Sequence, residues 1–182
     1  MLKLKCAVQS YAWGKHGSNS IVGRIARKNS HEVAEESKSF EETPFAEYWM
    51  GDHANGPSKF NVSPENCAWL NEPDFIQANQ GNTICLSELI SLNPATYLGS
   101  GYSERFPYAG NGLAFLFKVL SVQTALSIQA HPDRSTAQRL HAEQPSIYKD
   151  PNPKPEVAIA LTDDFAALFG FATPDLLAAN FS

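Results

Sequence analysis

Hydrophobic and polar positions alternate along much of the chain in short runs, which is the period of a β-strand. Five segments combine such runs with aromatic or branched residues and are bounded by turn formers: residues 3–8, 45–50, 113–121, 125–130 and 155–161. The 12 prolines and 11 glycines are scattered, so they separate short elements instead of forming one flexible linker. The pattern predicts a strand-rich body.

Four segments have helical signals. Apolar residues recur at helical spacing within residues 19–28, where Asn19 or Ser20 can cap the helix. A second helix is expected after His131, with Pro132 in its first turn, and a third around residues 87–92. Thr173 precedes Pro174 and Asp175 as a helix start close to the end of the chain, so we expect the sequence to stop inside a helix.

Composition narrows the class of protein. A chain of 182 residues with 43% hydrophobic and 18% charged residues is long and apolar enough to fold around a core. With 14 Lys and Arg against 19 Asp and Glu, the net charge of −5 argues against a nucleic-acid surface or a polybasic membrane face. No apolar run is long enough for a signal peptide or a membrane span, so we expect a soluble, cytoplasmic protein.

Two further features receive structural interpretations. The three cysteines, Cys6, Cys67 and Cys85, are odd in number and widely spaced, so we expect reduced and buried thiols. The acidic residues 31–42 are expected to form a solvated loop or the exposed face of a helix.

The segment 125–131 is the first candidate for chemistry. Strand alternation places Ser127, Gln129 and His131 on one face and apolar residues on the other. A Gln-x-His pair presents an amide oxygen and an imidazole nitrogen side by side, as two ligands of a divalent metal require. The alternative is a strand whose polar face meets solvent, or a buried His131 whose hydrogen bonds are satisfied.

The second candidate is the segment 148–161. Three prolines impose an extended approach to an apolar run, and a period of two brings Lys154, Glu156 and Ala158 to one face. A carboxylate at the mouth of a buried strand requires a partner, which a metal can supply. The alternative is a surface pair of Lys154 and Glu156.

Lys118 and Glu47 are charged residues inside apolar strands. Lys118 shares its predicted face with Ala114, Leu116 and Leu120, and buried lysines are rare unless they are paired. The alternative for Lys118 is a side chain that extends to solvent from a strand end. Glu47 is predicted to share its face with Phe45 and Trp49.

Four segments together resemble a known family. Residues 9–20, 44–51, 115–133 and 148–162 are similar, in order and approximate spacing, to the amino-terminal part of type I mannose-6-phosphate isomerases. The resemblance implies a mainly β fold, a cupin jelly-roll-like β-sandwich with peripheral helices and the start of a helical insertion. It implies a partial catalytic domain over residues 1–172 and the beginning of a truncated helical region over residues 173–182.

The family's functional residues transfer motif by motif. By resemblance, the zinc ligands are Gln129, His131 and Glu156. Residues that match positions lining the cleft around the metal are Lys118, Lys154 and Glu47, expected to be catalytic, with Ser127 and Trp13 expected to bind substrate. A fourth ligand, a histidine, and a catalytic arginine are expected beyond Ser182. Pro153 stands where the family usually has a histidine, and we expect this change to alter the stiffness of the loop.

The implied activity is a zinc-dependent interconversion of mannose 6-phosphate and fructose 6-phosphate through an enediol. One zinc ion, a small-molecule sugar phosphate as partner and a monomeric state are expected, and the 182-residue chain alone is expected to be poorly active. Either Lys118 or Lys154 could serve as the acid or base. The alternatives are another metal cupin, such as an iron oxygenase, and a metal or sugar-phosphate binding fragment that needs the missing part.

Overall fold

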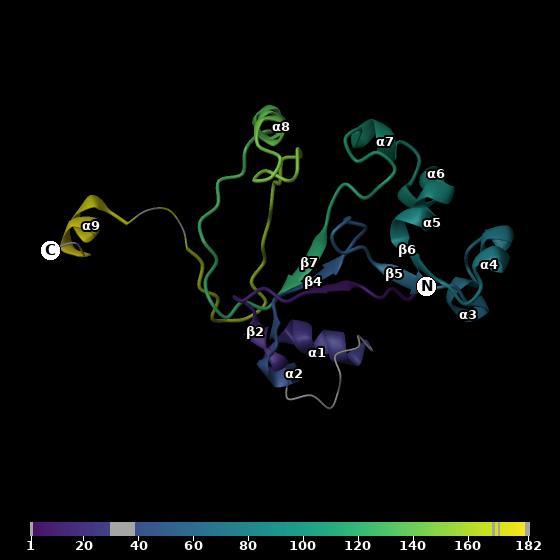
Figure 1. The fold of residues 1–182 in the computed structure, drawn as a ribbon, viewed down its shortest axis with the longest axis horizontal. Helices are drawn as coiled ribbons and strands as arrows, with labels where there is room; N and C mark the ends of the chain where they lie inside the picture. The colour runs from purple at the N-terminus through teal and green to yellow at the C-terminus, as the bar shows by residue number, and fades with distance from the viewer. Residues whose placement is uncertain (1, 30–38, 169, 171, 181–182) are drawn as a thin grey trace. The chain divides into compact units, whose positions relative to one another are not determined.

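The computed structural model describes residues 2–29, 39–168, 170 and 172–180. The chain forms two compact units, residues 1–124 and residues 125–182. The first unit contains all the strands that the structure describes, and the second contains two helices in its described part. The ribbon in Figure 1 shows the elements of each unit, labelled where there is room.

The centre of the first unit is a three-stranded antiparallel sheet of order β1–β4–β7. Its strands are β1 (Ala7–Gln9), β4 (Glu47–Met50) and β7 (Phe117–Leu120). Two smaller antiparallel ladders pair β2 (Lys15–His16) with β3 (Pro44–Phe45) and β5 (Lys59–Asn61) with β6 (Thr83–Cys85). β7 lies within the predicted strand at residues 113–121, so that prediction is confirmed for a shorter strand. β1 overlaps the predicted strand at residues 3–8 only at its end, and the single strand predicted at residues 45–50 is divided at Ala46 into β3 and β4.

Helix α1 (Ile21–Lys28) covers one face of this sheet. Val22 on the helix packs with Cys6, Phe45 and Tyr48 in a buried apolar cluster. Ser20 caps the helix as predicted, because its hydroxyl oxygen accepts a hydrogen bond from the Gly23 amide at 3.1 Å.

A second apolar cluster lies around β5 and β6. Phe60 and Ile84 from the two strands pack with Cys67 and Leu89 from the helices that follow each strand. Cys67 belongs to α3 (Pro64–Cys67), which with α4 (Pro73–Asn79) follows β5. Leu89 belongs to α5 (Leu86–Leu92), which with α6 (Pro94–Leu98) and α7 (Tyr102–Arg105) follows β6. The helix predicted around residues 87–92 is thus confirmed as α5.

The acidic segment is described only in part. Residues 31–38 lie outside the described residues, while the rest forms α2 (Ser39–Glu42) beside the short 3₁₀ helix η1 (Gly17–Asn19). The Glu41 carboxylate accepts hydrogen bonds from the amide and the hydroxyl of Ser18 at 3.0 and 2.9 Å. These bonds lower the pKa of Glu41.

All three cysteines are free. Cys6 and Cys67 are buried, as predicted, whereas Cys85 is only partly buried because it lies at the junction of β6 and α5.

The second unit contains α8 (Arg134–Glu143) and α9 (Pro174–Asn180). The helix expected after His131 is present, but it begins after Asp133, whose side chain caps it, so Pro132 lies outside the first turn. The helix predicted to follow Thr173 corresponds to α9.

The strands predicted at residues 125–130 and 155–161 are wrong for this structure. Both segments lack regular secondary structure, and the side chains of Val157, Ile159 and Leu161 are 91%, 80% and 86% exposed. A strand requires a neighbour that pairs with its backbone groups, and no described residue supplies a ladder to either segment.

The fold class is predicted only in part. The sheets are antiparallel and have peripheral helices, but helices occupy more of the described chain than strands do, so the described part is mixed rather than mainly β. Its three sheets do not close into a barrel, and the jelly roll and the boundary at residue 172 stay predictions. Across the described ranges, every helix is too short or too polar to cross a bilayer.

Candidate functional site

The three-stranded sheet has one apolar and one polar face. In β4, Tyr48 points to the cluster under α1, so Glu47 and Trp49 point to the opposite face. The register pairs Trp49 with Lys118 and Glu47 with Leu120, and directly paired residues share a face. Lys118 therefore shares its face with Leu120, as predicted, whereas Ala114 and Leu116 precede the strand and cannot be placed by its alternation.

Glu47, Trp49 and Lys118 form a connected group on the polar face. The Lys118 ammonium lies 3.2 Å from Oε2 of Glu47, and their side chains are 29% and 10% exposed. The same ammonium lies over the indole of Trp49, 4.9 Å from the ring centroid. The indole Nε1–H donates a hydrogen bond to the same Glu47 oxygen. Lys118 is thus a paired lysine, not one that merely extends to solvent.

Phe45 does not share the face of Glu47. Phe45 belongs to β3 and packs in the cluster under α1. Between the two residues, the Ala46 amide donates to the Gln9 carbonyl at 2.9 Å and the Ala46 carbonyl accepts from the Ser121 amide at 2.8 Å. The chain therefore changes pairing partners at Ala46, and simple alternation does not hold across this change.

Trp13 lies in the segment before β2. Its ring stacks on Tyr11 with 5.8 Å between centroids, and its carbonyl accepts a hydrogen bond from the Gln123 amide at 2.9 Å. The next residue is a glycine for a steric reason, because a Cβ on Gly14 would lie within 3 Å of Ala46. Close backbone packing thus fixes the position of Trp13 in the first unit.

In the second unit, α8 separates His131 from the proline-rich segment. The Asp133 carboxylate accepts a hydrogen bond from the Thr136 amide at 2.8 Å, and this bond, with side-chain contacts to Thr136 and Ser135, lowers the pKa of Asp133. Ala137 is buried on the inner side of the helix. The cap places the start of α8 three residues after His131.

The return from α8 is held by polar contacts. A ring nitrogen of His141, near the end of the helix, contacts the Tyr148 carbonyl. Asp150 then forms a turn, because Oδ1 accepts hydrogen bonds from the amide and the side chain of Asn152 at 2.9 and 3.1 Å. Partial burial raises the pKa of Asp150, but the bonds from Asn152 and the charge of Lys154, 3.5 Å away, outweigh it and leave the pKa lowered.

This return brings His131 and Glu156 together. The imidazole Nε2 lies 3.7 Å from Oε2 of Glu156, although the two residues are 25 positions apart in the sequence. Two ligands of a tetrahedral zinc, with bonds of about 2.0–2.2 Å, lie roughly 3.3–3.6 Å apart. The observed 3.7 Å is slightly longer than this range, and the nitrogen and oxygen donors are of the kind that zinc prefers.

The remaining predicted residues of this unit lie near the pair in sequence. Gln129 and Ser127 are exposed in the irregular segment before His131, and Lys154 pairs with Asp150. In the described residues, no three His, Cys, Asp or Glu side chains are grouped to hold a metal. The prediction that His131 and Glu156 project from strands is wrong, because helix α8 and an irregular return segment, not a sheet, join the two residues.

Three residues that organise these charged groups, Trp49, Asp150 and Asn152, were not among the predicted site residues. Trp49 is an aromatic residue two positions after a carboxylate on one strand, and that spacing was a usable signal for its bond to Glu47. Asp150 and Asn152 form an Asp-x-Asn sequence, which is typical of a side-chain-stabilised turn. The contact of Trp49 with Lys118 and that of Asp150 with Lys154 are seen only in the tertiary structure.

Comparison with known proteins places the chain in a family. Residues 1–173 match the family described as phosphomannose isomerase type I, catalytic domain. The chain belongs to this family. It is 49% identical over 173 residues to a probable mannose-6-phosphate isomerase of Echinococcus multilocularis and 44% identical over 168 residues to the human mannose-6-phosphate isomerase. These alignments cover 94% and 92% of the chain.

The chain spans about a third of the length of these relatives, 33% and 34% respectively. Solved structures agree with the assignment. A mannose 6-phosphate isomerase from Salmonella typhimurium, described as bound to its substrate, fructose 6-phosphate, and to zinc, matches with a TM-score of 0.53 and 29% identity. It covers 85% of this chain, and 33% of the Salmonella chain is covered.

Proposed function

We propose that the protein interconverts mannose 6-phosphate and fructose 6-phosphate with the help of one bound zinc ion. The approach of His131 to Glu156 is the observation that carries the proposal, because it brings a nitrogen and an oxygen donor close to the spacing of zinc ligands. Membership of the phosphomannose isomerase family and the zinc and fructose 6-phosphate of the Salmonella relative support it.

Gln129, His131 and Glu156 are the proposed metal ligands. Zinc bound by two neutral groups and one carboxylate keeps a net positive charge and supplies a Lewis acid for developing oxyanion charge. Glu156 remains more than half exposed, so it can turn toward a metal without leaving a core. Gln129 lies two residues before His131 and is exposed as well.

Isomerisation of an aldose to a ketose removes the proton from C2, returns a proton to C1, and moves the hydroxyl proton from O2 to O1 through an enediol. Lys118 and Lys154 are the proposed groups for holding or moving these protons. Each lies beside a carboxylate partner, Glu47 at 3.2 Å from Lys118 and Asp150 at 3.5 Å from Lys154. Glu47 is proposed to assist Lys118.

Substrate binding is proposed to use Ser127, Trp13 and the two lysines. The net charge of −5 opposes a sugar phosphate, but salt screens distant charges within about 8–10 Å. Nearby ammonium groups therefore dominate the interaction with the phosphate.

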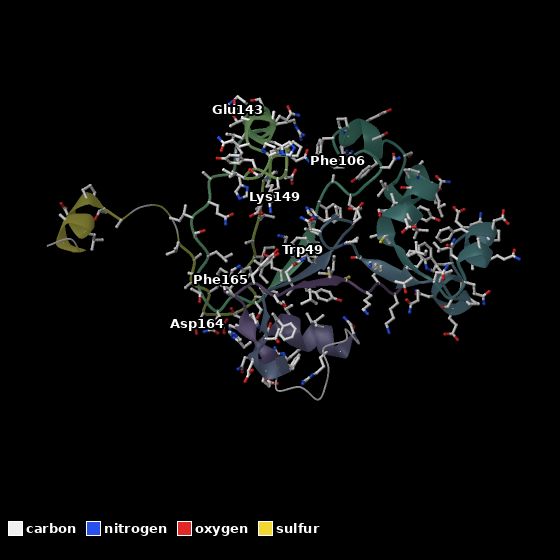
Figure 2. The ribbon with its side chains drawn as sticks, viewed as in Figure 1. Trp49, Phe106, Glu143, Lys149, Asp164 and Phe165 are labelled. Atoms are coloured by element: carbon white, nitrogen blue, oxygen red, sulfur yellow. The ribbon has the colours of Figure 1, made fainter. Side chains whose placement is uncertain are left out.

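Metal analysis tests the ligand assignment. Full-length protein purified without chelators is expected to hold one zinc per chain, and Glu156→Ala is expected to lose most of it. Glu143→Ala is the matched control, because Glu143 is also an exposed carboxylate of this unit and pairs with Arg139 at 3.1 Å. Figure 2 labels Glu143 on α8. Unchanged zinc in Glu156→Ala, or equal loss in the control, would refute the assignment.

Steady-state kinetics test the lysines. If Lys118 or Lys154 stabilises charge in the transition state, its change to Met lowers kcat more than it raises KM. If a lysine only holds the phosphate, KM rises and kcat is kept. Lys149→Met is the control, because Lys149 is an exposed lysine in the same return segment. Normal constants in both lysine variants would remove these side chains from the mechanism.

A binding fragment without turnover is the second candidate. Two observations favour it. Among the described residues, no three His, Cys, Asp or Glu side chains are grouped to hold a metal, and the chain spans about a third of the length of its relatives. Assaying both the 182-residue chain and the full-length protein distinguishes the two: the enzyme proposal expects turnover in the full-length protein and little in the chain alone. Elemental analysis separates a further candidate, an iron-dependent cupin, because that protein would hold iron instead of zinc.

A further inference from the structure

Trp49 lies on the polar face of the sheet and contacts both charged residues of that face, Glu47 and Lys118. Its Nε1–H donates to Oε2 of Glu47, and its ring faces the Lys118 ammonium at 4.9 Å. The same Oε2 receives the ammonium at 3.2 Å. One indole thus contacts a carboxylate through its edge and an ammonium through its face.

The indole itself is immobilised by the loop that follows β4. A Cβ added to Gly56 would lie 3.1 Å from Cε3 of Trp49, so the loop backbone packs directly on the ring. His53 meets the ring edge-on with 5.2 Å between centroids. Ser58 fixes the loop, because its hydroxyl accepts from the Gly51 amide at 3.1 Å and its amide donates to the Gly51 carbonyl at 2.7 Å.

Burial makes the two contacts interdependent. Glu47 is almost completely buried, and a buried carboxylate requires charged or hydrogen-bonding partners. Without the indole N–H, the carboxylate is free to rotate toward its remaining partner, Lys118. The rigid indole therefore determines where the carboxylate lies and, through it, where the ammonium lies.

We propose that Trp49 is a positioning residue, which orients Glu47 and thereby Lys118 for the isomerase reaction. This inference rests on the proposed function, in which Lys118 touches the substrate. Trp49 acts through Glu47 and contributes most when charge develops in the transition state, because preorganised groups matter most there.

A double-mutant cycle tests this coupling in the full-length, zinc-loaded protein. Trp49→Phe keeps an aromatic ring near the ammonium but removes the N–H donor. We expect kcat to fall about ten-fold with KM changed less than about two-fold, as for loss of a hydrogen bond to a charged group. In a Glu47→Gln background, the same change is expected to alter kcat less than about two-fold. Equal losses in both backgrounds, or no loss in either, would overturn the proposal.

Two further variants complete the kinetic test. Trp69→Phe is the matched control, because Trp69 is 49% exposed outside this group, and it is expected to leave both constants unchanged. Gly56→Ala crowds the indole at 3.1 Å, together with Ala7 and Gln9 at 3.0 Å, without removing it, and serves if Trp49→Phe does not fold. It is expected to lower kcat with the same dependence on Glu47.

An NMR readout separates this inference from the proposed function. The Trp49 indole N–H is expected to exchange with solvent at least about ten-fold more slowly than that of Trp69, and Glu47→Gln is expected to remove most of this protection. If the Trp49 indole N–H is protected from exchange but the wild-type protein has no isomerase activity, the proposed function is refuted, and with it the role of Trp49 in catalysis. Fast exchange in an active protein would overturn the positioning role alone.

Discussion

Residues 1–124 bury two apolar clusters between antiparallel ladders and helices, whereas Ala137 is the one buried residue that the structure describes in residues 125–182. Similar apolar alternation occurs in both units. In the first unit, β4 pairs with a strand on each of its edges, and most of its side chains are buried. In the second, residues 155–161 have no such edge, and their apolar side chains are exposed. Apolar alternation thus becomes a strand only where a partner is available.

The two units also hold their charged residues differently. Glu47 and Lys118 are organised by a sheet and a packed indole. His131 and Glu156 are brought together by a capped helix and an Asp150 turn, with little apolar burial. We therefore expect packing changes to affect the first unit and ligand or pH changes to affect the second.

The largest difference is expected from core truncation. Phe60→Ala removes a side chain that is 1% exposed in the first unit and is expected to cost about 3–5 kcal/mol of unfolding free energy. Phe165→Ala in the second unit, whose ring is 49% exposed, is expected to change it by less than about 0.5 kcal/mol. Urea unfolding of the 182-residue chain measures both. Comparable losses would show that the contrast in burial does not govern stability.

Zinc is expected to act mainly on the second unit. At a zinc concentration about 100-fold above Kd, binding stabilises the bound form by about 2.7 kcal/mol. Amide hydrogen exchange over residues 131–156 is therefore expected to slow about 100-fold, with the β1–β4–β7 sheet unaffected. Glu156→Gln is expected to abolish the effect and Glu143→Gln to preserve it. Equal slowing in both units would contradict a metal site confined to residues 131–156.

Loss of the Ser20 cap is expected to have a smaller effect. Its buried hydroxyl accepts from the Gly23 amide and donates to the Phe45 carbonyl at 2.8 Å. Ser20→Ala leaves both groups unsatisfied and is expected to cost about 1–2 kcal/mol. Ser91→Ala is the control, because its hydroxyl makes an exposed bond to the Ser87 carbonyl. Thermal unfolding that does not distinguish the two variants would contradict the role of the cap.

The smallest expected effect is a local pH dependence at Asp150. Hydrogen bonds and Lys154 lower its pKa below the ordinary 3.8, so its stabilising contribution is complete above that value and is lost as pH falls through the lower, folded pKa. The NMR shift of the Asn152 amide is expected to titrate with a midpoint below 3.8. Asp150→Asn is expected to remove this transition. A midpoint at or above 3.8 would show that the turn does not favour the ionised carboxylate.

Local signals in the sequence predicted the elements that depend on neighbouring residues. The Ser20 cap and the apolar spacing after it predicted α1, and the aromatic residues of 45–50 predicted one strand where the structure has the end of β3 and β4. The resemblance to phosphomannose isomerases, carried by four motifs, predicted the family, which the match over residues 1–173 confirms. Both kinds of inference use information contained in short segments of chain.

The tertiary structure decided which of these segments meet. Alternation could not reveal that the chain changes pairing partners at Ala46. Nor could it reveal that helix α8 and an irregular return segment, instead of a sheet, bring His131 to Glu156. It also could not show that Trp49 joins Glu47 to Lys118, because β4 and β7 are separated by more than 60 residues. Residue types determine which chemistry a chain can perform and which local elements it favours. Contacts between distant segments depend on strand pairing, on register and on the burial that the whole fold provides.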